Sequence, residues 1–177
     1  MLTAGAALHA ATLARLSMDE MIDQSSDIVR ARVVSSRSGF RGASGTRGMI
    51  YTWYTLNVIE RWKGGNAAQG EVAVPGGSAQ GLRQTISGAP ALHPGDEYVF
   101  FVWTSRTGLA QIIGLSQGLF DVKPDAGGKL AATRAPATEP VLDPVTGKPV
   151  QDRGTRYTYD ELKTMVSKRL AAAGRTQ

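Results

Sequence analysis

The sequence predicts a mostly β (α+β) fold, a small barrel or sandwich accompanied by one short N-terminal helix and one amphipathic C-terminal helix. Many short segments combine β-branched and aromatic residues, and turn signals separate them at intervals, which is typical of barrels and sandwiches. Two other segments place apolar residues at helical spacing directly after a capping box. With 21 glycines and 8 prolines among 177 residues, the chain is rich in turns, and its length lies in the usual range for one domain.

The N-terminal segment, residues 1–16, is rich in alanine and leaves two interpretations open. It is either the remnant of an export signal or a flexible N-terminus, because it lacks the basic start and the apolar stretch of about 7–15 residues of a complete signal peptide. Ser17 and Glu20 then have the spacing of a capping box, in which a hydroxyl and a carboxylate satisfy free amide groups at a helix start. A short helix is therefore predicted over residues 18–24.

The predicted β domain spans residues 17–134. Its strongest strand signal lies at residues 49–60, where aromatic and β-branched residues alternate over a long run. The expected core face of that strand carries Ile50, Thr52, Tyr54, Leu56 and Val58. Residues 97–104 are almost uniformly apolar, which predicts a central strand. Further strands are predicted over residues 27–35, 71–74, 82–86, 111–115, 119–122 and 129–133, and residues 36–48 are predicted to form a loop.

The last part of the chain divides into an irregular segment and a helix. Residues 135–157 are proline-rich and polar and predict an irregular surface segment. Thr158 and Glu161 form a second capping box, and an apolar stripe at helical spacing follows it. Residues 158–173 are therefore predicted to form a helix that packs on the barrel.

The residue inventory limits the chemistry available to this chain. There is no cysteine, so disulfides, thiolate nucleophiles and cysteine-ligated metals are excluded. His9 and His93 lack the partner spacing of a zinc site. No metal, cofactor or catalytic residue is predicted. No apolar run approaches the ~18–20 residues that a membrane-spanning helix needs.

Residues 114–118 match G-x-S-x-G, the motif around the nucleophile of many serine hydrolases. That motif requires a helix after the serine, and an acidic residue and then a histidine later in the chain. Here a strand is predicted at residues 119–122, and both histidines precede Ser116. The segment is interpreted as a glycine-flanked bend between two strands, and a serine hydrolase is the least favoured of three functions.

A net charge of +5 favours acidic partners, but the basic residues are scattered along the sequence. The residues proposed from sequence to bind a partner are Arg41 and Arg47 in a glycine-rich loop and Arg61, Trp62 and Lys63 at the end of the strongest strand. A protein partner is the leading expectation. The alternative is a single-stranded nucleic acid, whose bases would stack on Tyr51, Trp53 and Trp62.

Several sequence strings resemble the netrin-like and TIMP-like domains, and most closely their exported bacterial branch. The likeness is carried by SDIVRARV (residues 26–33), YTLNVIERWKG (54–64) and HPGDEYVFF (93–101), with support from VPGG (74–77) and GLSQGLF (114–120). It extends over residues 17–122. The resemblance implies an OB-like, closed or partly open barrel of about five to seven strands with flanking helices, exported and non-catalytic.

Animal relatives in that superfamily inhibit metalloproteases through an N-terminal cysteine that binds the catalytic zinc. This chain has no cysteine, so that mechanism cannot be transferred. The leading function hypothesis is therefore a non-enzymatic, periplasmic or secreted binding module that engages a protein, with a possible connection to proteases. A cytoplasmic, nucleic-acid-binding barrel is the alternative.

Overall fold

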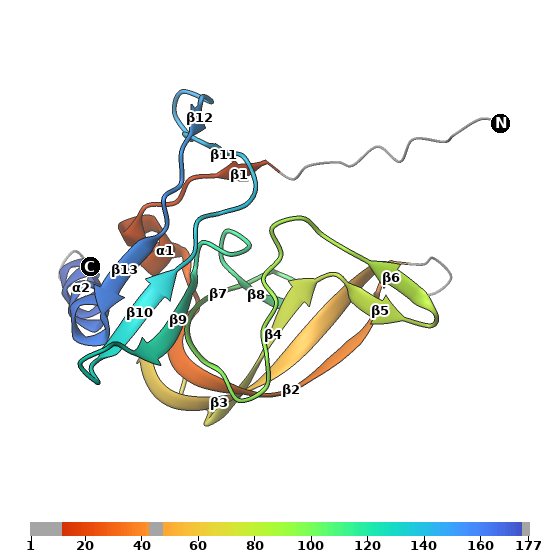
Figure 1. Ribbon diagram of the computed structural model, residues 1–177, viewed down its shortest axis with the longest axis horizontal. Helices are drawn as coiled ribbons and strands as arrows, with labels where there is room; N and C mark the ends of the chain where they lie inside the picture. Colours follow the sequence, from red (N-terminus) through yellow and green to blue (C-terminus); the bar gives the residue numbers. More distant parts are fainter. Residues whose placement is uncertain (1–11, 43–47, 175–177) are drawn as a thin grey trace.

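A computed structural model describes residues 12–42 and 48–174 (Figure 1). The described chain is β-rich with two helices, which confirms the predicted class. The helices are α1 (Met18–Gln24) and α2 (Tyr159–Ala173), and both begin at the predicted capping boxes. In each box the hydroxyl of the cap residue accepts a backbone N–H, and the Glu carboxylate accepts the N–H of the cap residue. Neither helix is long and apolar enough to span a membrane.

Most strands belong to one sheet of eight strands in the order β13-β10-β9-β7-β2-β3-β4-β8. Their bounds are β2 (Asp27–Arg41), β3 (Met49–Lys63), β4 (Gln69–Pro75), β7 (Glu97–Thr104), β8 (Ala110–Ile112), β9 (Leu119–Pro124), β10 (Leu130–Arg134) and β13 (Thr155–Thr158). Because β7 also pairs with β8, five of these strands form a ring, β2-β3-β4-β8-β7. The ring closes narrowly, since β4 and β8 are joined by the single pair Ala73 and Gln111.

Two small sheets complete the structure. β1 (Leu13–Ala14) pairs in parallel with β11 (Val141–Leu142), which pairs on its other edge with β12 (Pro149–Val150). β5 (Gly77–Ala79) and β6 (Leu82–Gln84) form a hairpin near the far ends of β2 and β3 (Figure 1). The segment predicted to be irregular, residues 135–157, thus contains β11, β12 and the start of β13. β11 pairs with Leu13 and Ala14, which lie inside the predicted N-terminal tail, so both predictions are corrected by the same long-range pairing.

The predicted loop over residues 36–48 is wrong in its first half. Residues 36–41 continue β2 and pair with the start of β3, down to Arg41 opposite Met49. The physical reason is the partner strand: a polar segment with little strand propensity of its own is held by a strong neighbour. The guanidinium of Arg37, for example, lies over the Trp53 ring at 4.7 Å from its centroid.

The apolar side chains form two separate cores. One fills the ring and includes Val29, Val33, Tyr54, Leu56 and Phe100. The predicted core face of β3 is confirmed, because Ile50, Tyr54 and Leu56 are all buried.

The second core lies outside the ring, where α1 and α2 cover the sheet, and it includes Ile22, Phe101, Phe120, Leu162 and Val166. Strand β7 contributes to both cores, since successive side chains point to opposite faces. Its predicted central position is therefore confirmed.

Candidate functional site

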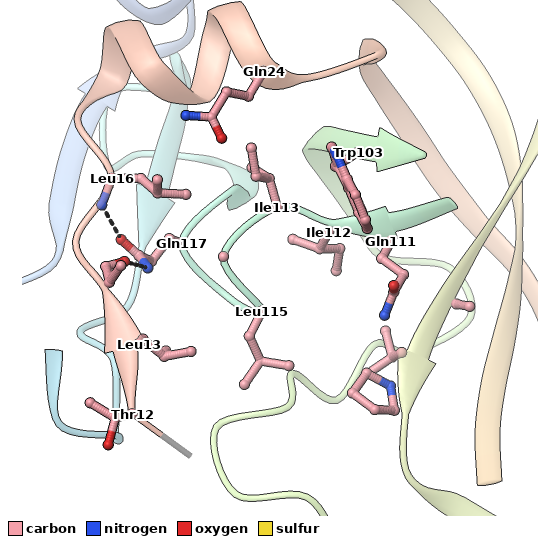
Figure 2. Close-up of a pocket in the computed structure, with 15 residues that line it drawn as sticks. Thr12, Leu13, Leu16, Gln24, Trp103, Gln111, Ile112, Ile113, Leu115 and Gln117 are labelled. Carbon is pink, nitrogen blue, oxygen red and sulfur yellow. Dashed lines mark hydrogen bonds between the residues drawn. The ribbon is translucent and has the colours of Figure 1, made fainter. Parts of the chain in front are cut away.

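A pocket of about 400 Å³ lies between residues 12–16, which we call the N-terminal strap, and the outer face of the ring (Figure 2). The strap supplies Leu13 and Leu16, and β7 and β8 supply Trp103, Gln111 and Ile112. The turn after β8 closes the pocket with Leu115 and Gln117. Figure 2 shows these side chains converging from three parts of the chain.

A row of directly paired residues crosses the strands of the ring and begins in the pocket. Trp103 pairs with Gln111, and Gln111 pairs with Ala73 on the next strand. Ala73 in turn pairs with Trp53, which pairs with Arg37. Directly opposed residues share one face of a sheet, so this row runs across the outer face of the ring. Trp103 is 44% exposed, which is unusual for the largest apolar side chain and leaves its ring available to a ligand.

The turn between β8 and β9 places Leu115 in a strained backbone conformation. Its φ is +63°, in the left-handed region that branched and bulky side chains rarely adopt. The preceding Gly114 has a φ of +60°, which glycine adopts without steric cost. Strain of this kind concentrates at binding sites, and here it turns the Leu115 side chain toward the pocket (Figure 2).

Gln117 fixes the strap against this turn. Its Oε1 accepts the backbone N–H of Leu16 at 2.9 Å, and its Nε2 donates to the carbonyl oxygen of Ala14 at 2.8 Å. The side chain is buried, at 5% exposure, so both polar atoms are satisfied by the strap and not by water.

The next residue, Gly118, allows the turn to pack closely, because a Cβ there would lie 2.5 Å from Ile113 Cγ2 and 2.9 Å from Phe101 Cβ. A side chain at this position would push the turn away from β7. The close approach at Gly118 therefore keeps Leu115 and Gln117 in place beside the pocket.

Among the residues that the structure describes, no ionisable side chain lines this pocket. Its polar groups are the side-chain amides of Gln24, Gln111 and Gln117 and the hydroxyl of Thr12. Amides donate and accept hydrogen bonds without charge, so they suit peptide groups at the edge of an apolar contact. Within the described chain, the pocket therefore offers apolar surface and uncharged hydrogen-bonding groups, which suit binding.

A second pocket, of about 460 Å³, gathers titratable groups near the start of β7. His93 Nδ1 lies 3.6 Å from Asp96 Oδ2, which also accepts the Tyr98 hydroxyl at 3.2 Å. Burial, reinforced by the Asp96 carboxylate, raises the pKa of Tyr98 to about 12. Nearby, the hydrogen bond to Asp121 raises the pKa of Lys123.

Ser116 also lines this second pocket, in the same cavity as His93. Within the described chain no hydrogen bond joins the Ser116 hydroxyl to the His93 imidazole, whose side chain is 72% exposed. A strand, β9, follows Ser116, as predicted, where a nucleophile motif requires a helix.

The predicted partner-binding residues at the end of β3 lie together, but each is engaged within the fold. Trp62 packs against the outer core, with its ring centroid 5.4 Å from that of Tyr159. Arg61 donates to Asp27 Oδ1 at 2.6 Å and to the Ala67 carbonyl at 2.8 Å.

Lys63 donates to the carbonyl oxygens of Ile22 and Asp23, at 2.7 and 3.0 Å, near the C-terminal end of α1. Together with Arg61 and Trp62, it therefore fastens the end of β3 to the rest of the fold.

The two predicted loop arginines lie elsewhere. Arg41 is the last residue of β2 and donates to the Thr107 carbonyl and hydroxyl oxygens at 3.2 and 2.9 Å, so it joins the far end of β2 to the β7–β8 turn. Arg47 lies outside the described residues, as does His9. Among the residues that are described, no three His, Asp or Glu side chains come together as a metal site would require.

Sequence reasoning missed the pocket residues Trp103, Gln111 and Leu115. Trp103 had one usable signal, because it is a tryptophan at the end of an otherwise apolar strand next to a polar turn. Gln117 lies inside the G-x-S-x-G string, and its role could not be predicted locally because its partners Ala14 and Leu16 lie far away in the sequence. Comparison of the sequence with protein-family models and with curated proteins found no match.

Proposed function

We propose that this protein is a non-enzymatic binding module whose pocket beside the N-terminal strap takes an apolar side chain of a protein partner. The observation that carries the proposal is the uncharged pocket with the 44%-exposed Trp103 at its wall. Exposed tryptophans in such pockets are typical of residues that dominate protein interfaces. The amides of Gln24 and Gln111 are available to hydrogen-bond the partner's backbone.

The fold that we propose for the ring is an OB-type barrel. Its support is the strand order β2-β3-β4-β8-β7, in which β4 and β8 are parallel and the other neighbours are antiparallel. The strands are also staggered, as in barrels. The row of paired residues across the outer face begins at Trp103, whose neighbour Val102 pairs with Asp27 at the start of β2. After one circuit of the ring the row reaches β2 again at Arg37, much further along that strand. The resemblance to exported netrin-like and TIMP-like domains supports a periplasmic or secreted location.

The pocket is tested with the full chain as bait on a periplasmic or secreted fraction, and then with purified partner in a titration. Trp103→Ala is expected to lower partner affinity by about tenfold or more, because it removes the exposed anchor ring. The matched control is Val145→Ala, which shortens an apolar side chain that is 91% exposed on the β11–β12 turn. Equal affinities for both variants would refute the proposal that the partner binds in this pocket.

A second candidate is single-stranded nucleic acid at the outer face of β3. There the Tyr51 and Trp53 rings lie 5.9 Å apart, centroid to centroid, with Arg37 over Trp53. Aromatic rings beside arginine are the elements that stack bases and contact phosphates. Trp62 does not join this group, because it packs in the outer core.

The two candidates are separated by titrating a labelled oligothymidylate at low and at high salt. Salt-dependent binding that Trp53→Ala abolishes would support the nucleic-acid candidate. Absence of binding at low salt would exclude it.

A further inference from the structure

The hydrogen bonds described for the N-terminal strap are made by its backbone. The N–H of Leu13 donates to the Pro140 carbonyl at 3.0 Å, and the N–H of Arg15 donates to the Leu142 carbonyl at 2.8 Å. Gln117 bonds the other side of the strap, at the carbonyl of Ala14 and the N–H of Leu16. Such contacts recognise an extended chain of almost any sequence, as in strand addition to a sheet edge.

The strap lies in a groove that is bordered by two pockets and by β11. The pocket described above lies on one side, and a pocket of about 380 Å³ lies on the other, and both are lined by Leu16 and Gln117. Strand β11 borders the strap, and its other edge is occupied by β12. Without the strap, β11 would present an open strand edge and Gln117 would hold a buried amide without partners. Both conditions favour replacement by another extended chain.

Few interactions oppose such a replacement. β1 has two residues, and each of its hydrogen bonds contributes only a small net stabilisation. Leu16 is the strap's main apolar contribution to the outer core. Segments held in this way open locally without global unfolding.

We infer that the groove occupied by residues 12–16 is a recognition site for an extended peptide segment of a partner protein, and that the strap is its displaceable internal occupant. The strap itself shows what the groove accepts: apolar side chains at the places of Leu13 and Leu16, and a backbone N–H at the places of Leu13, Arg15 and Leu16. A partner segment with a proline at the place of Leu13, Arg15 or Leu16 is excluded, because proline lacks the N–H that these places require. A partner strand in the groove also rebuilds the wall of the adjacent pocket.

The test uses the full chain and a labelled, end-capped peptide TLARLS, the sequence of residues 12–17. Arg15→Pro in the chain removes the N–H that bonds Leu142 and leaves the groove unchanged, so it weakens the internal competitor alone. The Arg15→Pro chain is expected to bind the peptide about tenfold or more tightly than the wild-type chain, because an attached occupant competes at a millimolar effective concentration. The matched peptide TLAPLS is expected not to bind.

A second chain variant tests the two hydrogen bonds that the Gln117 side chain makes to the strap. Adding Gln117→Leu to the Arg15→Pro chain is expected to weaken peptide binding by about tenfold, since two hydrogen bonds are lost. A folded Arg15→Pro chain that does not bind TLARLS, or that binds TLAPLS equally well, would overturn the inference.

A measurement on the wild-type chain keeps the inference testable if Arg15→Pro does not fold. The Leu16 amide is expected to exchange with solvent by local opening, much faster than the amides of β7. Exchange of Leu16 only through global unfolding would overturn the inference. The Trp103→Ala experiment keeps the strap in place, so it tests the proposed binding pocket independently of the proposed peptide groove.

Discussion

The side-chain amide of Gln117 donates a hydrogen bond to the carbonyl oxygen of Ala14, 103 positions earlier in the chain, at 2.8 Å. Together with the bond from the Leu16 N–H, this contact positions one wall of the pocket. The wall therefore depends on a buried side chain in the turn between β8 and β9. The stability of that contact is directly measurable.

Gln117→Leu keeps the approximate shape of the side chain and removes both hydrogen bonds. We expect it to lower the free energy of unfolding by about 1–3 kcal/mol, because the strap's polar groups lose their buried partners. At about 2–4 °C per kcal/mol for a chain of this size, the loss is visible in thermal denaturation. Ser116→Ala is the control, since this hydroxyl makes no hydrogen bond within the described chain. An unchanged melting temperature for Gln117→Leu would contradict the stabilising role of these two hydrogen bonds.

Gly118→Ala is expected to destabilise the protein by about 1–3 kcal/mol, the usual cost of overpacking. The added Cβ would meet Ile113 Cγ2 at 2.5 Å and Phe101 Cβ at 2.9 Å. Gly65→Ala is the matched control, because nothing lies within 4 Å of a Cβ at that position. Denaturant titration of both variants measures the difference, and equal midpoints would show that the turn does not approach β7 this closely.

Capping boxes and apolar stripes predicted both helices because their signals are local. The extension of β2 to Arg41 could not be predicted in this way, since its cause is the pairing of each residue with β3. The same limit applies to the strap, where Leu13 pairs with Val141 far along the chain. Local patterns specify elements, and long-range pairing decides how far they extend.

The candidate site illustrates the same distinction. The partner-binding role of Arg61, Trp62 and Lys63 stays a prediction. Their contacts with Asp27, the Ile22 carbonyl and the Tyr159 ring could not be predicted from local sequence, because these groups lie far away along the chain. Trp103 looked like another core residue of an apolar strand. It is 44% exposed near the end of β7, where it pairs with Gln111 of β8.

Asp152 supports the segment before β13 through a bidentate pair with Arg134, with both contacts at 2.6 Å. This hydrogen-bonded pair, opposed by burial and helped by the N–H groups of Ala137 and Gly154, holds the pKa of Asp152 well below its ordinary value. The stabilisation is therefore present above the ordinary carboxyl pKa and is lost as the pH falls toward the lowered one.

Asp152→Asn is expected to reduce stability at neutral pH by about 3 kcal/mol, since it leaves a half-buried arginine without its charge partner. The variant should also lose less stability than the wild type between pH 5 and pH 2, because over this range the unfolded carboxyl gains its proton while the folded one stays ionised beside Arg134. Denaturant titrations at several pH values measure both effects. Parallel pH profiles for the two chains would contradict the assigned role.

Tyr98 makes the stability of the fold depend on pH in the opposite sense, because its contribution is lost as the pH rises. Its pKa is raised from 10.0 to about 12 by burial and by the Asp96 carboxylate, so the folded state holds the phenolic proton more tightly than the unfolded state. The resulting stability is present below pH 10 and is lost as the pH rises through about 12. Tyr98→Phe cannot ionise and is expected to lose less stability than the wild type over this interval. Ultraviolet titration of the phenols checks the raised pKa independently, and a Tyr98 that titrates at its ordinary value would contradict it.

The central claim is that the uncharged pocket beside the N-terminal strap binds a protein partner through Trp103. The most direct measurement is a calorimetric titration of purified partner into wild-type, Trp103→Ala and Val145→Ala chains that melt at similar temperatures. The claim predicts an affinity lower by about tenfold or more for Trp103→Ala alone. Wild-type affinity in the Trp103→Ala chain would contradict it.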